Sequence, residues 1–310
     1  MGDTVLRLIV FRSAQGLVSL WAVTVMLFII TRITGDPVQV LLPPEASREM
    51  YDQVRSSLGL DRPLIVQYFS YLGDLLRGDL GVSFQSQVPV SEMIGNRLPA
   101  TLELGGAALL VTFVVGLPLG LYAGYRRGKL VDRVASMLAV LGQAAPTFLI
   151  GILAVLVLAV HLELLPAGGR GGLSHLILPA VTMAWASVAG VTRLMRSSVL
   201  ETLESDYIRL CRVKGMSETR VLWKHALRNA ALPVLTFGGV VTAGMMTGSV
   251  VTEAVFVWPG VGRLLLDAIG ARDFPVVQGV VLVLAGVYIV VNIIVDIFYA
   301  YLNPRLRVNS

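Results

Sequence analysis

Hydrophobic residues are concentrated in six long runs, and polar residues fill the segments between them. The runs lie within residues 8–31, 101–125, 134–160, 176–191, 232–251 and 276–299, and the fourth run is the shortest. A helix of about 20 apolar residues crosses a hydrocarbon core roughly 30 Å thick. The pattern therefore predicts an all-α, polytopic membrane protein with six transmembrane helices.

The first run has one competing interpretation, a cleaved signal peptide, because Arg7 and Arg12 accompany its start. Its apolar core is longer than a signal peptide requires, and the following "ITRITGDP" contains no small-x-small cleavage site. We therefore expect this run to remain as an anchor.

The composition agrees with a membrane protein. The chain is 55% hydrophobic and 15% charged, with a mean hydropathy of +0.75. Such values lie outside the usual range of soluble domains. Most of the 25 lysines and arginines fall in segments that share one side of the membrane with the N-terminus. The positive-inside rule then places both termini in the cytoplasm.

The longest outer segment, residues 32–100, is not of low complexity. Within it, "LIVQYFSYLGDLL" has helical periodicity, and Gly78 is well placed to end the helix. The residues predicted to share one face are Leu64, Ile65, Tyr68, Leu72, Leu75 and Leu76. We expect a small folded cap, and a purely structural lid is one interpretation of it.

A basic segment interrupts the chain on the cytoplasmic side, between the fourth and fifth runs. The sequence "SSVLETLESDYIRLCRVK" predicts that the fourth helix continues beyond the membrane, and Gly215 supplies a left-handed residue to end it. Ser217 then caps a short second helix, with Glu218 in its first turn. The chain is expected to re-enter the membrane at Leu232.

The predicted second helix is amphipathic. Its basic positions are Arg220, Lys224 and Arg228, and its apolar positions are Leu222, Trp223, Ala226 and Leu227. Such a helix is typical of a segment lying on the anionic inner leaflet, and it also suits a docking surface for a cytoplasmic partner. Periodicity does not separate the two.

Motifs for catalysis, nucleotide binding and metal binding are missing. The segment "GYRRGKL" from Gly124 is too short between its glycines for a phosphate loop, and Leu130 stands where a magnesium-binding hydroxyl belongs. The three histidines are scattered, and Cys211 is the one cysteine. We expect a non-catalytic chain without a metal site, and its basic charge requires no nucleic acid.

Polar residues within the runs are few. Asp296 lies near the inner interface, where we expect it to pair with an arginine, and Asn292 is expected to bond to a neighbouring helix. Gly116, Gly120 and Gly124 form a repeated G-x-x-x-G pattern, and the fifth run is also glycine-rich. Close helix packing is the expected role, with lining of a pore as the alternative.

Several segments together resemble one family. They are "LGLDRPLIVQYFSYLGDLLRGDLGVSF", "RLPATLEL", "DYIRLCRVKGMSETRVLWKHALRNAALPVL", "TEAVFVWPGVGRLLLDAI", "RDFPVVQG" and "NPRLR". The chain is similar over nearly its whole length to B-type permease subunits of the dipeptide/oligopeptide/nickel ABC importers. Its cytoplasmic segment resembles the family's E-A-A loop, with Arg209, Leu210 and Cys211 where the motif's name-giving residues would stand.

The resemblance implies two functional regions. The loop residues that would contact the ATPase are Arg209, Cys211, Lys214, Gly215, Met216, Ser217, Arg220, Val221, Trp223, Lys224 and His225. The residues that would form the docking surface for a binding protein and the outer gate are Tyr68, Tyr71, Phe256, Trp258, Pro259 and Gly260.

The same resemblance implies a domain plan and partners. Residues 1–94 would form the first helix and cap, 95–304 the permease core with the coupling loop at 199–231, and 305–310 a cytoplasmic tail. The implied partners are a C-type permease subunit, two ATPases that bind ATP and Mg, an extracytoplasmic binding protein, a peptide and the lipids of the bacterial inner membrane. Nickel or another small solute is an alternative substrate, and a stand-alone secondary transporter is an alternative function.

Overall fold

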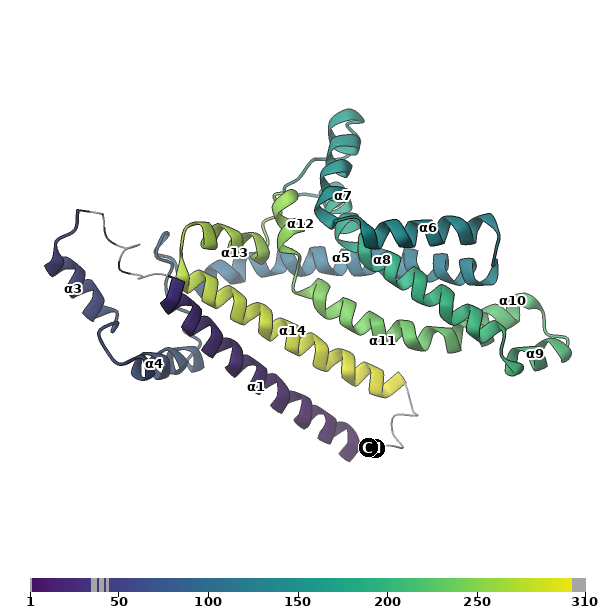
Figure 1. The fold of residues 1–310 in the computed structure, drawn as a ribbon, viewed down its shortest axis with the longest axis horizontal. Helices are drawn as coiled ribbons and strands as arrows, with labels where there is room; N and C mark the ends of the chain where they lie inside the picture. The colour runs from purple at the N-terminus through teal and green to yellow at the C-terminus, as the bar shows by residue number, and fades with distance from the viewer. Residues whose placement is uncertain (1, 35–37, 39–41, 43–44, 303–310) are drawn as a thin grey trace.

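The computed structural model describes residues 2–34, 38, 42 and 45–302 and is an elongated assembly of helices (Figure 1). The described residues form no strand, apart from an isolated bridge between Val82 and Pro89. The helices are α1 (Gly2–Thr34), α3 (Arg48–Ser57), α4 (Leu64–Leu76), α5 (Val90–Tyr125), α6 (Leu130–Ala144), α7 (Thr147–Ala154), η1 (Val155–His161), α8 (Leu173–Leu203), α9 (Asp206–Val213), α10 (Glu218–Arg220), η2 (Val221–Ala226), α11 (Leu227–Met246), α12 (Val250–Val255), α13 (Val261–Gly270) and α14 (Phe274–Leu302).

Five of the described helical segments are long and apolar enough to cross a membrane, as the all-α prediction requires. They are α1, α5, α8, α14 and the continuous helix Glu218–Met246. The predicted third span differs, because α6 and the α7–η1 helix meet at an angle of 107°. This pair supplies a sixth span only if both halves are counted together.

The bend lies between Ala145 and Pro146. Ala145 is extended, with ψ of 128°, because the ring of the following proline disfavours a helical residue before it. Pro146 then caps α7. A single apolar run in the sequence thus becomes two helices with different directions.

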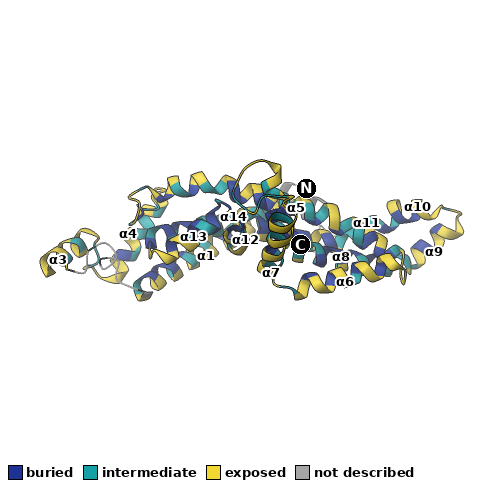
Figure 2. Cartoon of the chain, turned by 90° about the horizontal axis from the view of Figure 1, so that it is seen from above, coloured by how far each residue is buried: buried dark blue, intermediate teal, exposed yellow. Residues whose placement is uncertain are grey.

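The centre of the fold is the contact between α5 and α8. A Cβ atom at Gly120 would lie 2.6 Å from the carbonyl oxygen of Thr192, and one at Gly124 would lie 2.8 Å from Cβ of Val199. These close approaches confirm the predicted role of the glycines in close helix packing. Figure 2 shows buried residues where the helices meet and exposed residues along their outer faces.

The helices α1 and α14 lie side by side, with α14 between α1 and α11 (Figure 1). The guanidinium of Arg12 is 2.9 Å from the carboxylate of Asp296, so the predicted ion pair is confirmed. The prediction for Asn292 is wrong, because its amide donates to the carbonyl of Tyr288 in the same helix, at 2.9 Å. The predicted cytoplasmic tail, residues 305–310, lies outside the described residues.

The two hydrophilic regions lie at opposite ends of the long axis, with α3 and α4 at one end and α9 and α10 at the other (Figure 1). This separation fits the prediction that the cap and the basic loop face different sides of the membrane. Gly78 follows α4 with φ of +81°, as expected for a residue that ends a helix.

Candidate functional site

The first candidate site is the cytoplasmic loop at Asp206–Ala226, which makes a sharp turn at Gly215. Gly215 has φ of +72°, and its N–H donates to the carbonyl of Arg212 at 2.9 Å. The N–H of Met216 donates to the carbonyl of Cys211 at 3.3 Å. These bonds are typical of a left-handed helix end, so the predicted role of Gly215 is confirmed.

An ion pair bridges the turn. Nε of Arg212 lies 2.8 Å from Oε1 of Glu218, and Nη2 of Arg212 lies 3.3 Å from Oε2. This bidentate contact raises the pKa of Arg212. Ser217 occupies the N-cap position, but its side chain makes no capping hydrogen bond. The predicted serine cap is therefore absent, and the Arg212–Glu218 pair joins the two sides of the turn instead.

The helix after the turn is not a separate element. It starts at Glu218, passes through the π-helical residues Val221–Ala226 and continues to Met246 without a break. The predicted short, separate helix before Leu232 is therefore wrong, and Pro233 lies inside α11. The segment nearest the turn and the fifth span consequently form one continuous helix.

The segment before the turn is more divided than predicted. The helix α8 ends at Leu203, and α9 begins at Asp206 after the N-cap residue Ser205. The hydroxyl of Ser205 donates to the carbonyl of Thr202 at 2.6 Å. The loop is thus attached to α8 by a short joint and to α11 by a continuous helix.

One face of the loop is buried against the cytoplasmic ends of the membrane helices. Ile208, Cys211 and Val221 pack in one cluster with Met195 and Val199 of α8. Cys211 is 5% exposed, so direct contact with a partner, which we expected of Cys211 and Val221, is wrong for this structure. A small residue at this position fills the interior of the loop.

The opposite face forms an exposed ridge, which we call the coupling ridge. Its members among the predicted residues are Arg209, Lys214, Gly215, Ser217, Arg220, Trp223 and Lys224, while Met216 and His225 are partly buried beside it. Trp223 is 47% exposed and makes an edge-to-face contact with Tyr122, whereas Leu222 and Ala226, which were predicted on the same apolar side, are buried.

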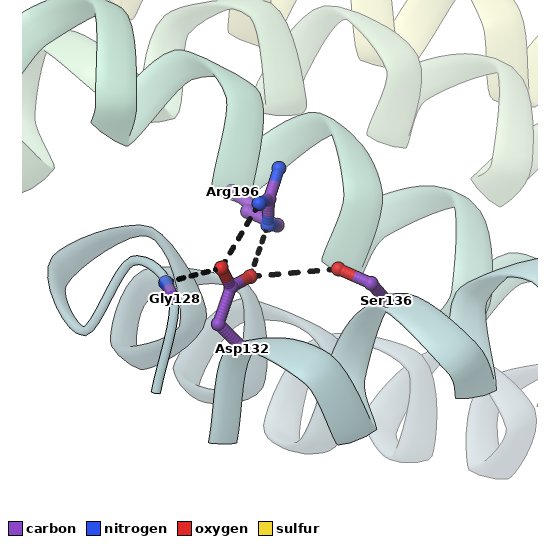
Figure 3. Close-up of polar contacts among 4 residues, drawn as sticks. All are labelled: Gly128, Asp132, Ser136 and Arg196. Carbon is purple, nitrogen blue, oxygen red and sulfur yellow. Dashed lines mark hydrogen bonds and ion pairs between the residues drawn. The ribbon is translucent and has the colours of Figure 1, made fainter. Parts of the chain in front are cut away.

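A polar cluster supports the base of the loop (Figure 3). Asp132 of α6 accepts from Nε of Arg196 at 2.5 Å and from Nη2 at 3.1 Å. It also accepts from the N–H of Gly128 at 2.8 Å and from the hydroxyl of Ser136 at 3.4 Å. The cluster joins the α5–α6 turn to α8. Sequence analysis missed it, although Asp132 is the one acidic residue in the basic stretch "RRGKLVDR".

The second candidate site is the outer loop between α12 and α13. Glu253 is fully buried, and its carboxylate accepts from the hydroxyl of Thr101 at 2.8 Å and from the N–H of Arg263 at 2.9 Å. The indole N–H of Trp258 donates to the carbonyl of Ala100 at 2.8 Å. These bonds hold the loop against α5.

The predicted docking residues of this loop are mostly inaccessible. Phe256 is 0% and Trp258 is 1% exposed, and Gly260 is buried beside Glu253. Direct docking by these side chains is therefore wrong for this structure, while Pro259 is partly exposed. Between the two aromatic residues, Val257 is 51% exposed and has φ of +51°. Val257 is therefore exposed at the surface of the loop, whereas the neighbouring Phe256 and Trp258 are buried.

The predicted aromatic residues of the cap also face inward. The rings of Tyr68 and Tyr71 pack on Phe28 of α1, and the hydroxyl of Tyr68 lies 2.9 Å from that of Thr24. The predicted apolar face of α4 is wrong in part, because Leu64, Ile65 and Leu76 are exposed. The tyrosines fix the cap to α1, and the exposed residues of α4 lie on its outer side.

Two family models match the chain. One, described as "Binding-protein-dependent transport system inner membrane component", matches residues 116–308, and its N-terminal counterpart matches residues 5–105. The solved inward-facing methionine ABC transporter MetNI shares the fold, with a TM-score of 0.58 and 16% identity over 69% of this chain and 97% of that one.

Two curated relatives are similar over most of their length. The dipeptide transport system permease protein DppB of Escherichia coli (strain K12) is 39% identical, covering 89% of this chain and 91% of its own. The glutathione transport system permease protein GsiC of Salmonella choleraesuis (strain SC-B67) is 40% identical, covering 96% and 98%. The chain therefore belongs to the family of inner membrane components of binding-protein-dependent transport systems.

Proposed function

We propose that this chain forms one half of the pore of an ATP-driven importer for peptides. The other half would be a C-type permease subunit, and a binding protein outside the membrane would deliver the peptide. The observation that carries the proposal is the coupling ridge, because its residues Arg220, Trp223 and Lys224 lie on a helix that continues without a break into the fifth span.

This geometry suits a subunit that receives movement from another protein. Ligand binding shifts a protein between two states only through contacts that differ between those states. A displacement of the coupling ridge would be transmitted along the continuous helix Glu218–Met246 and, through the short connection at Ser205, to α8. ATP and Mg would bind to two partner ATPases, whose clefts would hold the ridge, and this chain would hydrolyse nothing.

The substrate class follows from the relatives. One relative is named for dipeptide transport and another for glutathione transport, and glutathione is itself a short peptide. Nickel is the alternative solute, but no group of metal-ligating side chains occurs in the part of the chain that the structure describes. A peptide is therefore the better-supported substrate.

Docking of the binding protein would involve exposed residues near those that the sequence suggested. Val257 projects from the outer loop, and Leu64 and Ile65 project from α4. The buried residues Phe256 and Trp258 would hold the loop in position for this contact.

Uptake in a strain without its own peptide importers tests the proposal. The chain is expressed together with its proposed partners, which are the C-type permease subunit, the ATPases and the binding protein. Uptake of a radiolabelled dipeptide, a tripeptide and nickel is then compared. We expect peptide uptake that disappears when the partner ATPase is inactivated. Uptake of nickel alone, or peptide uptake that persists without ATPase activity, would refute the proposal.

A further inference from the structure

A hollow of about 870 Å³ opens at the cytoplasmic end of the molecule, between α8 and the start of α11. Its volume is within the range of small-molecule sites in proteins, roughly 300–1,000 Å³. The two walls of this hollow, which we call the inner hollow, differ in chemical character.

The wall formed by α8 and the joint after it offers hydrogen-bond acceptors. Glu201 contributes a carboxylate. The hydroxyl of Thr202 donates to the carbonyl of Ser198 at 2.7 Å, and that of Ser205 donates to the carbonyl of Thr202 at 2.6 Å. Because these hydroxyl hydrogens are already used, both oxygens present only lone pairs to a ligand.

The wall formed by η2 and α11 offers donors. Lys224, Arg228 and Asn229 line the hollow from this side. Among the described residues, no carboxylate lies within 4.0 Å of the Lys224 or Arg228 nitrogens, although Arg196, Arg209 and Arg212 nearby are all paired. Glu201 is likewise without an ion-pair partner in the described part of the chain. The acidic and basic side chains that line the hollow therefore form no ion pair with one another.

From this arrangement we infer that the inner hollow is an exit-side site for a short zwitterionic peptide. The peptide's ammonium group would lie at Glu201 and its carboxylate at Arg228. The termini of an extended dipeptide are up to about 7 Å apart, which suits charges too distant to pair directly. A simple anion would leave Glu201 facing a like charge. This inference rests on the proposed function, because it concerns the released peptide.

Protection of a cysteine from labelling tests the inference. The full-length chain is purified with its partner subunits, without nucleotide, in phosphatidylglycerol–phosphatidylcholine discs. Ser205→Cys is introduced with Cys211→Ala, and its reaction with N-ethylmaleimide is timed. Alanyl-alanine at twice its dissociation constant is expected to slow labelling about threefold, and the uncharged N-acetyl-alanyl-alanine amide is expected not to. Val213→Cys, which lies outside the hollow, is the control and should label at one rate throughout.

Charge variants sharpen the test. Glu201→Gln should reduce protection by alanyl-alanine to the weaker level that N-acetyl-alanyl-alanine gives through its carboxylate alone, and should leave that weaker protection unchanged, whereas Arg228→Gln should weaken both. Asn229→Cys provides a second reporter if Ser205→Cys is poorly folded. Equal protection by charged and uncharged peptides, no labelling of either reporter, or no effect of Glu201→Gln would overturn the inference.

Two further outcomes separate the possible occupants and the two proposals. Protection without peptide in discs containing phosphatidylethanolamine, combined with no peptide effect in the other discs, would assign the hollow to a lipid headgroup and overturn the inference. The labelling requires neither the binding protein nor ATP. If peptide uptake succeeds and protection fails, only the exit-side site is wrong; if protection succeeds and uptake fails, the proposed import function is wrong.

Discussion

Arg212 and Glu218 form a bidentate ion pair across the turn at Gly215, with a shortest distance of 2.8 Å. Both side chains are more than one third exposed, so the pair contributes little to global stability, about 0–1 kcal/mol. Its consequence is geometric, because it joins the last turn of α9 to the first turn of the helix that becomes the fifth span. The coupling ridge is thereby held as one body.

Substitution of Gly215 is expected to disturb this turn through the backbone alone. A Cβ atom at Gly215 meets nothing within 4 Å, but its φ of +72° is unfavourable for a β-branched residue. Gly215→Val should cost about 1–2 kcal/mol locally, which corresponds to roughly a tenfold change in the population of the native turn. We expect strongly reduced uptake at a normal level of the protein in the membrane.

Gly215→Asn is the matched control, because asparagine tolerates the left-handed region. It should retain most of the uptake. Equal, normal uptake in both variants would show that the conformation of the turn is unimportant for transport.

Removal of Asp132 should destabilise the cytoplasmic end of the fold. Its side chain is 7% exposed, and Asp132→Ala would leave the partly buried Arg196 without its carboxylate. Because Arg196 remains partly solvated, we expect a loss of about 1–3 kcal/mol, measured as a lower midpoint of thermal unfolding in detergent. Asp74→Ala, which removes an exposed pair with Arg77, should change the midpoint little, and similar effects of both would contradict the account.

The α5–α8 contact gives a prediction about packing. Gly120→Ala places a methyl group 2.6 Å from the Thr192 carbonyl oxygen, so the helices must separate. Such overpacking costs about 1–3 kcal/mol. Gly244→Ala meets nothing within 4 Å and should be neutral or slightly stabilising. Detergent-solubilised variants compared by thermal aggregation would decide the matter, and equal midpoints would argue against close packing at Gly120.

Glu253 predicts a pH dependence of stability. Burial raises the pKa of Glu253 above its ordinary value of 4.5, although bonds from Arg263 and Thr101 and the charge of Arg97 oppose the shift. The folded protein therefore binds this proton more tightly than the unfolded chain does. Its stabilising contribution is present at low pH and is lost as pH rises from 4.5 through the raised value. Unfolding midpoints measured over that range should fall more steeply for the wild type than for Glu253→Gln, and parallel curves would contradict this.

Much of the fold follows from local patterns. The apolar runs, the turn at Gly215 and the pairing of Asp296 with an arginine were predicted because each depends on composition or on one residue's conformational preference. Two prolines show where such reasoning ends. Pro146 separates two helices, whereas Pro233 lies inside a continuous one, and the surrounding packing decides between these outcomes.

Long-range contacts account for the other differences in the candidate sites. Asp132 and Arg196 are 64 residues apart, and Thr101 and Glu253 are 152 apart, so no local pattern pairs them. From the sequence, Trp258 was predicted to be a docking residue in a loop. Its indole is instead buried, and the indole N–H donates to the carbonyl of Ala100 on α5. Accessibility in such loops depends on tertiary structure.

The most direct measurement of the central claim is site-specific crosslinking from the coupling ridge in the assembled transporter. Lys214→Cys is made in a Cys211→Ala background and combined with single cysteines placed one at a time across the surface of the partner ATPase. Each pair is treated with a short bifunctional maleimide. Leu149→Cys, in the membrane region, is the control. We predict a crosslink from Lys214→Cys to the ATPase whose yield changes when ATP is added, and none from Leu149→Cys. Labelling of Lys214→Cys by lipid-borne probes alone, with no crosslink to the ATPase, would contradict the account.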